Sequence, residues 1–290
     1  MKIFSPASVG LFFHVRTDRD GFYIFFFRTD RSRPVPTIKI LHLHKINIMK
    51  SAGKLYLIPI TLSNPGETTV IPEDVLPQTI KRTIDFIDNY IVENEKTARK
   101  FIKSIHPDKK QPDLKISVLN KHTETAAHYE FIKPLLNGEN IGLMSESGCP
   151  GIADPGAVIV KIAHEKGIQV VPLVGPSSIL LALMASGMNG QSFAFNGYLP
   201  IDKNDKKQAL KSFERLSQEK NQSQLFIETP YRNNKLMEDL LQILQPSTYL
   251  CVACDITLPT EYIKTKTINE WKKEKADLHN RPCIFIIHKM

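Results

Sequence analysis

The amino-acid sequence predicts an α/β protein built of two α/β domains, preceded by an N-terminal segment of different character. From residue 49 onward, short apolar runs alternate with stretches of helical periodicity, a pattern typical of a mostly parallel sheet covered by helices. Glycines and prolines interrupt this alternation near residues 176–189, and it then starts again. The composition, 42% apolar and 23% charged, is that of a globular protein.

Residues 49–176 are expected to form the N-terminal α/β domain. Short apolar runs between turn residues predict its strands, at Leu55–Ile60, Phe86–Glu93, Lys115–Leu119, Ile141–Ser145 and Gln169–Leu173. Helical periodicity predicts helices between them, at Pro77–Ile84, Thr97–Ser104, Ala126–Leu136 and Ala157–Lys166. The last helix is followed by Gly167, and glycine is the usual residue just beyond a helix.

Residues 177–290 are expected to form the C-terminal α/β domain. Helices are predicted at Ser177–Ser186, Lys206–Gln218 and Asn233–Leu244. Strands are predicted at Phe193–Tyr198, Gln224–Glu228, Tyr249–Asp255, Tyr262–Thr267 and Cys283–His288. Only the short helical stretch Ile268–Lys273 lies among the last three strands. Because parallel strands need long crossover connections, this second sheet is predicted to be mixed.

Residues 1–48 differ from the rest of the chain. They hold 7 of the 15 phenylalanines and show no clear helical or strand period, although a strand would fit Phe22–Arg28. No signal-peptide pattern is convincing there. The character changes at Met49. We therefore expect residues 1–48 to be a non-native or disordered extension, with a genuine flexible extension as the alternative.

Charge and cysteine content narrow the class of protein. The net charge is +8, but residues 1–48 hold eight basic and three acidic side chains, and the remainder holds 30 and 27. The body is therefore only mildly basic. Four cysteines in 290 residues do not make a disulfide framework, which points to a reducing cytoplasm. The longest uncharged run, Ile168–Ile201, contains prolines and glycines, so no membrane span is expected.

The most informative segment is Ile141–Gly156, where an apolar strand enters a glycine- and proline-rich loop that precedes a helix. Ligands in open α/β sheets bind beyond the carboxyl ends of strands. Gly148 and Gly151 would let the backbone approach a ligand closely. The segment therefore predicts a ligand-binding loop, with a tight structural turn as the alternative. The dinucleotide pattern G-x-G-x-x-G and the P-loop pattern are both missing from the sequence.

This loop resembles the S-D-A-G-T-P-x-I-S-D-P-G signature of the tetrapyrrole-methylase superfamily, in its branch of ribosomal RNA small subunit methyltransferases I. The sequence reads Ser145-Glu-Ser-Gly-Cys-Pro-Gly-Ile-Ala-Asp-Pro-Gly156, with Glu146, Ser147 and Cys149 in place of Asp, Ala and Thr. Further blocks resemble the family in the same order, at Gly53–Pro59, Glu93–Arg99, Val171–Ser178, Phe195–Pro200 and Phe226–Arg232. The resemblance spans roughly residues 53–288.

The resemblance implies a methyltransferase with a folded S-adenosylmethionine (SAM) between two α/β domains, and a homodimer. By position, the implied cofactor-binding residues are Pro59, Ser147, Gly148, Cys149, Ile152, Ser177, Ser178, Glu228 and Asp255. Methyl transfer is an in-line displacement, so positioning supplies much of the rate. A base would help to activate a ribose hydroxyl. The candidates are Glu93, Glu95, Lys96, Arg99 and His122, with Arg232 for phosphate or carboxylate contact. Each could equally be a surface charge or part of a helix ion pair.

Cys251 and Cys254 have the spacing of a metal-binding pair, but no second pair follows. Residues three apart on a strand point to opposite faces. We therefore expect ordinary buried thiols and no metal.

Three functions remain in competition. The first is 2′-O-methylation of small-subunit ribosomal RNA. The second is methylation of a tetrapyrrole or another small molecule, and the third is a non-catalytic SAM-binding protein. Lys203, Lys206, Lys207 and Lys211 fall on one predicted helix and favour an RNA partner, unless they are simply a solvated face.

Overall fold

A computed structural model describes residues 11–18, 21–29, 38–46, 51–62, 71–120 and 122–289, and of residues 11–46 only the backbone. Contacts divide the chain into two compact units, Met1–Ser51 and Ala52–Met290. The first unit contains the antiparallel strands β1 (Leu11–Asp18), β2 (Gly21–Thr29) and β3 (Ile38–Ile46), in that order. The strand expected at Phe22–Arg28 is therefore part of β2. The status of residues 1–48 as a non-native or disordered extension stays a prediction.

The second unit begins with a parallel five-stranded sheet in the order β6-β5-β7-β4-β8. Its strands are β4 (Leu55–Leu57), β5 (Asn89–Val92), β6 (Lys115–Val118), β7 (Ile141–Met144) and β8 (Val170–Pro172). All five predicted strands are present, and each is shorter than expected. Phe86, predicted to begin a strand, instead ends a helix.

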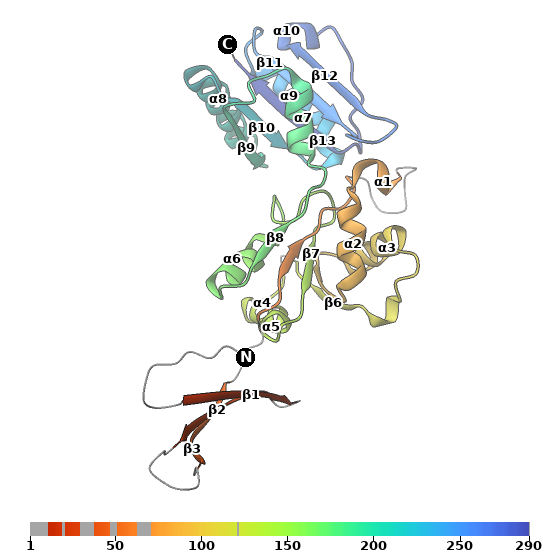
Figure 1. Ribbon diagram of the computed structural model, residues 1–290. Coiled ribbons are helices and arrows are strands. Elements are labelled where there is room, and N and C mark those ends of the chain that lie inside the picture. Colours follow the sequence, from red (N-terminus) through yellow and green to blue (C-terminus); the bar gives the residue numbers. More distant parts are fainter. Residues whose placement is uncertain are drawn as a thin grey trace. The chain divides into compact units, whose positions relative to one another are not determined.

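Helices cover both faces of this first sheet (Figure 1). On one face, α2 (Gln78–Phe86) and α3 (Glu95–Ile105) bury Ile80, Ile84, Phe101 and Ile102. On the other face lie α4 (Thr125–Phe131), α5 (Lys133–Leu136) and α6 (Ala157–Glu165). The helix expected at Ala126–Leu136 is thus divided in two, because Pro134 lacks the N–H that would continue it. Two short elements were not predicted, α1 (Pro72–Val75) and the 3-10 turn η1 (Gln111–Asp113).

The chain changes face between the neighbouring strands β4 and β7. After β4 it continues through α2 on one face, and after β7 it continues through α6 on the other. Such a switch point leaves a crevice beyond the carboxyl ends of the two strands, where open α/β sheets bind ligands. The loop predicted to bind a ligand follows β7 and therefore lies at this crevice.

A second five-stranded sheet follows, in the order β12-β11-β13-β10-β9. Its strands are β9 (Phe193–Tyr198), β10 (Ser223–Ile227), β11 (Tyr249–Cys254), β12 (Tyr262–Thr267) and β13 (Cys283–His288). Only β9 and β10 pair in parallel, and the other neighbours are antiparallel. The prediction of a mixed sheet is confirmed.

This second sheet also carries helices on both faces (Figure 1). Helix α7 (Ser178–Ser186) packs on one face, while α8 (Lys203–Lys220), α9 (Asn233–Ile243) and α10 (Ile268–Trp271) pack on the other. A 3-10 turn, η2 (Pro230–Arg232), precedes α9. The predicted domain boundary at residues 176–177 lies between β8 and α7, and the division into two domains stays a prediction.

The expectation of ordinary buried thiols is confirmed for Cys251 and is wrong for Cys254. Cys254 and Cys283 form a disulfide, because they lie directly opposite each other on the antiparallel strands β11 and β13. Cys149 and Cys251 are free thiols. No helix in the described part of the chain is long and apolar enough to cross a lipid bilayer.

The strand β4 and the turn after β8 approach so closely that only glycine fits between them. A Cβ atom added to Gly175 would lie 2.2 Å from Cβ of Pro59. This contact joins the chain just beyond β4 to the chain just beyond β8. It therefore fixes the spacing of the loops at the carboxyl edge of the sheet.

Substituting Gly175 by alanine is expected to destabilise the protein by about 1–3 kcal/mol, because the added methyl group forces the two backbones apart. Gly190→Ala is the matched control, since a Cβ atom there meets no atom within 4 Å. Urea unfolding of both variants measures the difference. Equal stability of the two variants would contradict the importance of this contact.

Candidate functional site

Three loops meet at the carboxyl ends of β4, β7 and β8, and hydrogen bonds join them. The N–H of Ile60 donates to the carbonyl oxygen of Gly148 at 3.0 Å, and the hydroxyl of Ser147 donates to the carbonyl oxygen of Leu62 at 3.3 Å. The thiol of Cys149 lies 3.3 Å from the carbonyl oxygen of Pro176. The loop after β7 is thus held from both sides.

The same loop is also braced from within. The carboxylate of Asp154 accepts hydrogen bonds from the N–H of Gly151 at 2.8 Å and the N–H of Gly156 at 2.6 Å. Burial raises the pKa of Asp154, while these backbone N–H groups oppose the shift. Gly148, Gly151 and Ala153 have positive φ angles of 69°, 85° and 61°. A strained alanine in such a loop persists only when its surroundings determine the conformation, so the loop is rigid.

A cavity of about 280 Å³ lies between this loop and the second sheet. Its walls are mostly apolar and come from both sheets. It is lined by Leu62, Ser147, Ser178, Tyr198, Ile227, Glu228, Pro230, Ala253, Asp255, Ile256, Leu258, Pro282, Cys283 and Ile284. Among these described lining residues there is no lysine or arginine. The site therefore combines an apolar slot with two carboxylates.

Both carboxylates are buried, and in each of them one oxygen accepts hydrogen bonds while the other does not. The side chain of Glu228 is 4% exposed, and its Oε1 accepts from the N–H of Thr229 at 2.8 Å. The side chain of Asp255 is 9% exposed, and its Oδ2 accepts from Thr260 Oγ1 at 2.9 Å and from Arg281 Nε at 2.8 Å. Oε2 of Glu228 and Oδ1 of Asp255 have no hydrogen-bond partner among the described residues. Each remains available to a ligand that carries donors.

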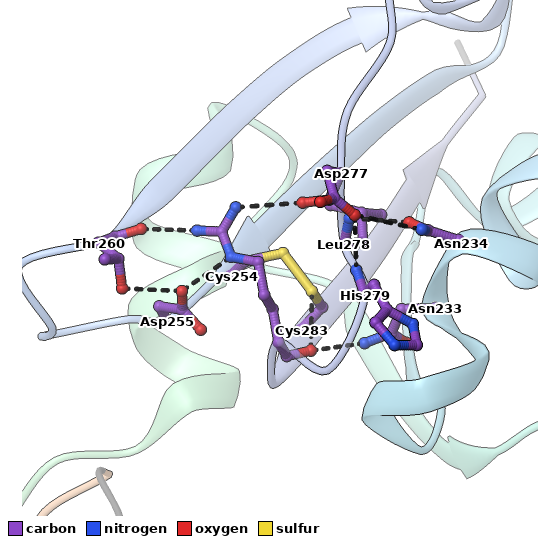
Figure 2. A network of polar contacts seen from close by, with 10 residues as sticks. Asn233, Asn234, Cys254, Asp255, Thr260, Asp277, Leu278, His279 and Cys283 are labelled. Carbon is purple, nitrogen blue, oxygen red and sulfur yellow. Dashed lines mark hydrogen bonds and ion pairs between the residues drawn. A yellow bond between two sulfur atoms is a disulfide. The ribbon is translucent and has the colours of Figure 1, made fainter. Parts of the chain in front are cut away.

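A polar network holds the wall around Asp255 (Figure 2). Arg281 also donates to the carbonyl oxygens of Thr260 and Asp277, and Asn233 donates to the carbonyl oxygen of Arg281 at 2.7 Å. The disulfide between Cys254 and Cys283 lies beside this network. Asp255 itself has a positive φ of 49°. The network therefore presents this carboxylate in one fixed orientation.

The predicted cofactor-binding residues fall into three groups. Ser147, Ser178, Glu228 and Asp255 line the cavity. Pro59, Cys149 and Ile152 line a neighbouring apolar hollow of about 400 Å³. Gly148 and Ser177 line neither: Gly148 joins two loops, and the hydroxyl of Ser177 caps the N-terminus of α7. Their roles in cofactor binding stay predictions.

The predicted catalytic residues do not all gather at one place. Glu95 and Arg99 form an ion pair at 2.8 Å along α3, and Arg99 also donates to the carbonyl oxygen of Gln111. His122 is exposed in the loop after β6. Of these four residues, Glu93 alone lines one of the hollows found in the described part of the chain, together with Asn94, Asn120, Glu146, Ala153, Asp154 and Pro155. Oε1 of Glu93 accepts from the N–H of Glu146 at 3.1 Å.

Glu93 is half-buried and lies near other carboxylates. Burial raises its pKa, and the negative charges of Asp154 and Glu146 raise it further against the hydrogen bond from Glu146. Glu146 lines this hollow and the next residue, Ser147, lines the cavity. A single loop therefore borders both spaces.

Sequence reasoning missed several residues of the cavity. Tyr198 and Pro230 line it. Both lie in blocks that resemble the family, although neither was predicted as a site residue. Arg281 had no motif signal at all, because its partner Asp255 lies 26 residues earlier in the chain. Such pairs become visible only when strand register is known.

The sequence was compared with known proteins. A family model described as Tetrapyrrole (Corrin/Porphyrin) Methylases matches residues 54–272. A Vibrio cholerae protein named ribosomal RNA small subunit methyltransferase I is 28% identical over 244 residues, which cover 83% of this chain and 79% of the relative. A Synechocystis protein of the same name is 30% identical over 205 residues, covering 71% and 67%.

Among solved structures, the crystal structure of the methyltransferase CobJ is similar in fold. It aligns with a TM-score of 0.55 at 14% identity, and the match covers 82% of this chain and 95% of that one. The predicted architecture of two α/β sheets with covering helices is confirmed. The chain therefore belongs to the tetrapyrrole (corrin/porphyrin) methylase family and is a methyltransferase that uses S-adenosylmethionine.

Proposed function

We propose that this methyltransferase acts on ribosomal RNA of the small ribosomal subunit and methylates a ribose 2′-oxygen. The observation that carries the proposal is the similarity to relatives named ribosomal RNA small subunit methyltransferase I along most of their length, as in Vibrio cholerae (79%) and Bacillus subtilis (71%). The cavity and its surroundings support the proposal in two respects.

First, the cavity suits SAM. Its apolar wall of Leu62, Ile227, Ile256 and Ile284 fits an adenine ring. The free oxygens of Glu228 and Asp255 can accept hydrogen bonds from ribose hydroxyls or from the ammonium group. No described lysine or arginine lines the cavity itself, and the nearby Arg232 and Arg281 each lie beside one of its carboxylates. Its volume of about 280 Å³ is near the lower end for small-molecule sites, and the hollow beside Pro59 and Cys149 offers further room.

Second, the charges on α8 favour an RNA substrate. On α8, Lys203, Lys207 and Lys211 are exposed and four residues apart, so they lie along one face. None of the three forms an ion pair with a carboxylate in the described part of the chain. Lys206 differs, since it pairs with Asp239 at 3.2 Å. Three unpaired lysines in a row suit a phosphate backbone.

The proposed chemistry is a displacement at a methyl carbon. Bound SAM supplies a methyl group on a positively charged sulfur. The bond from the ribose oxygen to the methyl carbon would replace the bond from that carbon to sulfur, and a base would accept the hydroxyl proton. We assign the role of this base to Glu93, since it is the predicted candidate that borders a hollow in the described part of the chain. The loop after β7 and the wall around Asp255 would orient the bound groups, and positioning of this kind supplies much of the rate of an in-line displacement.

Two further expectations remain proposals. A homodimer would be formed by apolar side chains exposed near the cavity loops, Val174, Leu180 and Met184, of which the last two lie one turn apart on α7. Light scattering on the purified chain measures its mass in solution. A ribosomal substrate also implies a cytoplasmic enzyme. The Cys254–Cys283 disulfide would then have to persist against cytosolic reductants.

Deleting the gene is expected to remove one methyl group from small-subunit ribosomal RNA, and the purified protein should restore it with labelled SAM. Mass mapping of the RNA from both strains locates the nucleotide. A porphyrinoid acceptor is the control. Transfer to the porphyrinoid, with none to the subunits, would contradict the proposed acceptor.

Glu228→Gln is expected to weaken binding of S-adenosylhomocysteine about tenfold, because hydrogen bonds to a charged group contribute roughly 1.5–3 kcal/mol. Calorimetry measures the dissociation constant. Glu238→Gln is the matched control, because Glu238 is exposed on α9 and pairs only with Lys235. Unchanged affinity in Glu228→Gln would exclude this carboxylate from the cofactor site.

The rate of methyl transfer is expected to rise with pH as Glu93 loses its proton. Because burial raises the pKa of Glu93, the protonated and inactive form should persist to higher pH than for an exposed glutamate. Glu93→Gln should slow transfer and abolish this limb of the pH–rate profile. Glu95→Gln should keep this limb, because Glu95 is engaged in an ion pair with Arg99. If the rise of the rate with pH survives in Glu93→Gln, another group is the base.

A further inference from the structure

Two exposed tyrosines lie at the carboxyl ends of the parallel strands β9 and β10 of the second sheet. Tyr198 ends β9 and is 62% exposed, and Tyr231 lies in η2 just after β10 and is 59% exposed. The parallel strands β9 and β10 pair Tyr198 with Ile227, so both tyrosines follow neighbouring strand ends on the same edge. Large aromatic side chains left in solvent at an edge that binds ligands suggest a contact surface.

These tyrosines lie at the rim of the SAM cavity. Tyr198 and Pro230 both line it, and Tyr231 follows Pro230 directly. Tyr231 itself is outside the lining. The rim therefore offers an aromatic ring on the cavity wall and a second ring just beyond it. An acceptor held by these rings would have its reactive atom close to the methyl donor.

A cation lies over the second ring. The guanidinium carbon of Arg232 is 5.2 Å from the centre of the Tyr231 ring, and Nη1 of Arg232 is 4.0 Å from Oε1 of Glu228. The guanidinium is thus fixed between a cavity carboxylate and the tyrosine. A cation on one face of a ring leaves the other face for stacking.

The turn that carries Tyr231 is held in place before any substrate arrives. The N–H of Asn280 donates to the carbonyl oxygen of Pro230 at 3.2 Å, and the N–H of Arg232 donates to that of Thr229 at 2.9 Å. Asn233 donates to the carbonyl oxygen of Arg281 within the network of Figure 2. A rim fixed in this way loses little conformational freedom on binding, which favours affinity.

We propose that Tyr198, Tyr231 and Arg232 form an aromatic clamp that stacks the nucleobase of an unpaired RNA nucleotide while its ribose faces the methyl donor. The inference rests on the proposed function and specifies that the target nucleotide binds with its base unpaired. Unpaired bases are recognised by stacking on aromatic rings and guanidinium planes. An enzyme that acts inside a cavity needs its target nucleotide out of the helical stack. Lys203, five residues after Tyr198 on the exposed start of α8, would meet the adjoining phosphate.

The test compares Tyr231→Leu, Tyr231→Phe, Tyr198→Leu and Tyr198→Phe in methyl transfer to small ribosomal subunits from a strain that lacks the gene. We expect each leucine variant to raise KM for the subunits about tenfold, as loss of one stacked base contact does. The phenylalanine variants should stay close to the original KM. Calorimetry with S-adenosylhomocysteine should give an unchanged dissociation constant for Tyr231→Leu.

Tyr129→Leu is the matched control. Tyr129 is also exposed, at 45%, and also has a cation near its ring, with Nζ of Lys166 at 5.9 Å from its centre. It lies on α4 and lines none of the cavities described above. Its loss should leave KM unchanged. Thermal unfolding of every variant checks that each remains folded.

The outcomes separate the clamp from the proposed function. If the unsubstituted protein methylates the subunits and the leucine variants keep its KM, the clamp is wrong and the proposed function stands. If Tyr198→Leu raises the dissociation constant of S-adenosylhomocysteine by as large a factor as it raises KM, Tyr198 is a cofactor contact and the clamp is overturned. If the unsubstituted protein methylates a porphyrinoid and never the subunits, both proposals fail.

Discussion

The close approach of Gly175 to Pro59 is the contact on which the site depends. It brings the turn after β8 against the chain that leaves β4, with no room for a side chain between them. The loop after β7 is then held between these two segments, through Ile60 on one side and Pro176 on the other. Because close-packed backbone transmits any displacement directly, a small change here would move every group that the loop presents.

The opposite wall of the cavity is held by a different kind of interaction. There a buried ion pair between Asp255 and Arg281, rather than close backbone packing, sets the position of the carboxylate. A buried charge that lacks a partner is costly, and the ion pair with Arg281 holds the Asp255 carboxylate in one orientation while its other oxygen stays free. Glu228 is held by hydrogen bonds instead, from the N–H and the hydroxyl of Thr229 to its Oε1. The protein thus keeps two acceptors ready for a ligand inside an otherwise apolar space.

Local patterns predicted the elements well where local physics decides them. All ten predicted strands of residues 55–288 are present, because short runs rich in β-branched, aromatic and other apolar residues between turn signals favour strands over helices. The errors arose where tertiary context prevailed. Phe86 is apolar but continues α2, Pro134 divides a helix, and Lys206 turns inward to Asp239 instead of joining the exposed lysine row. The disulfide escaped prediction because Cys254 and Cys283 become neighbours only through the register of β11 and β13.

For the site, the sequence alone determined the loop: glycines and prolines after a buried strand favour a tight turn at a sheet edge, and the family motifs predict that this turn binds S-adenosylmethionine. It also predicted Ser147, Glu228 and Asp255 as site residues, and all three line the cavity. Only the tertiary structure decided which residues share the cavity, because distant segments meet there, including Tyr198 at one strand end, Pro230 at the next and Pro282 near the C-terminus. It likewise separated Glu93, which borders a hollow, from Glu95, which pairs with Arg99. The physical reason is that chemistry at a site depends on distance and burial, and neither is encoded by spacing along the chain.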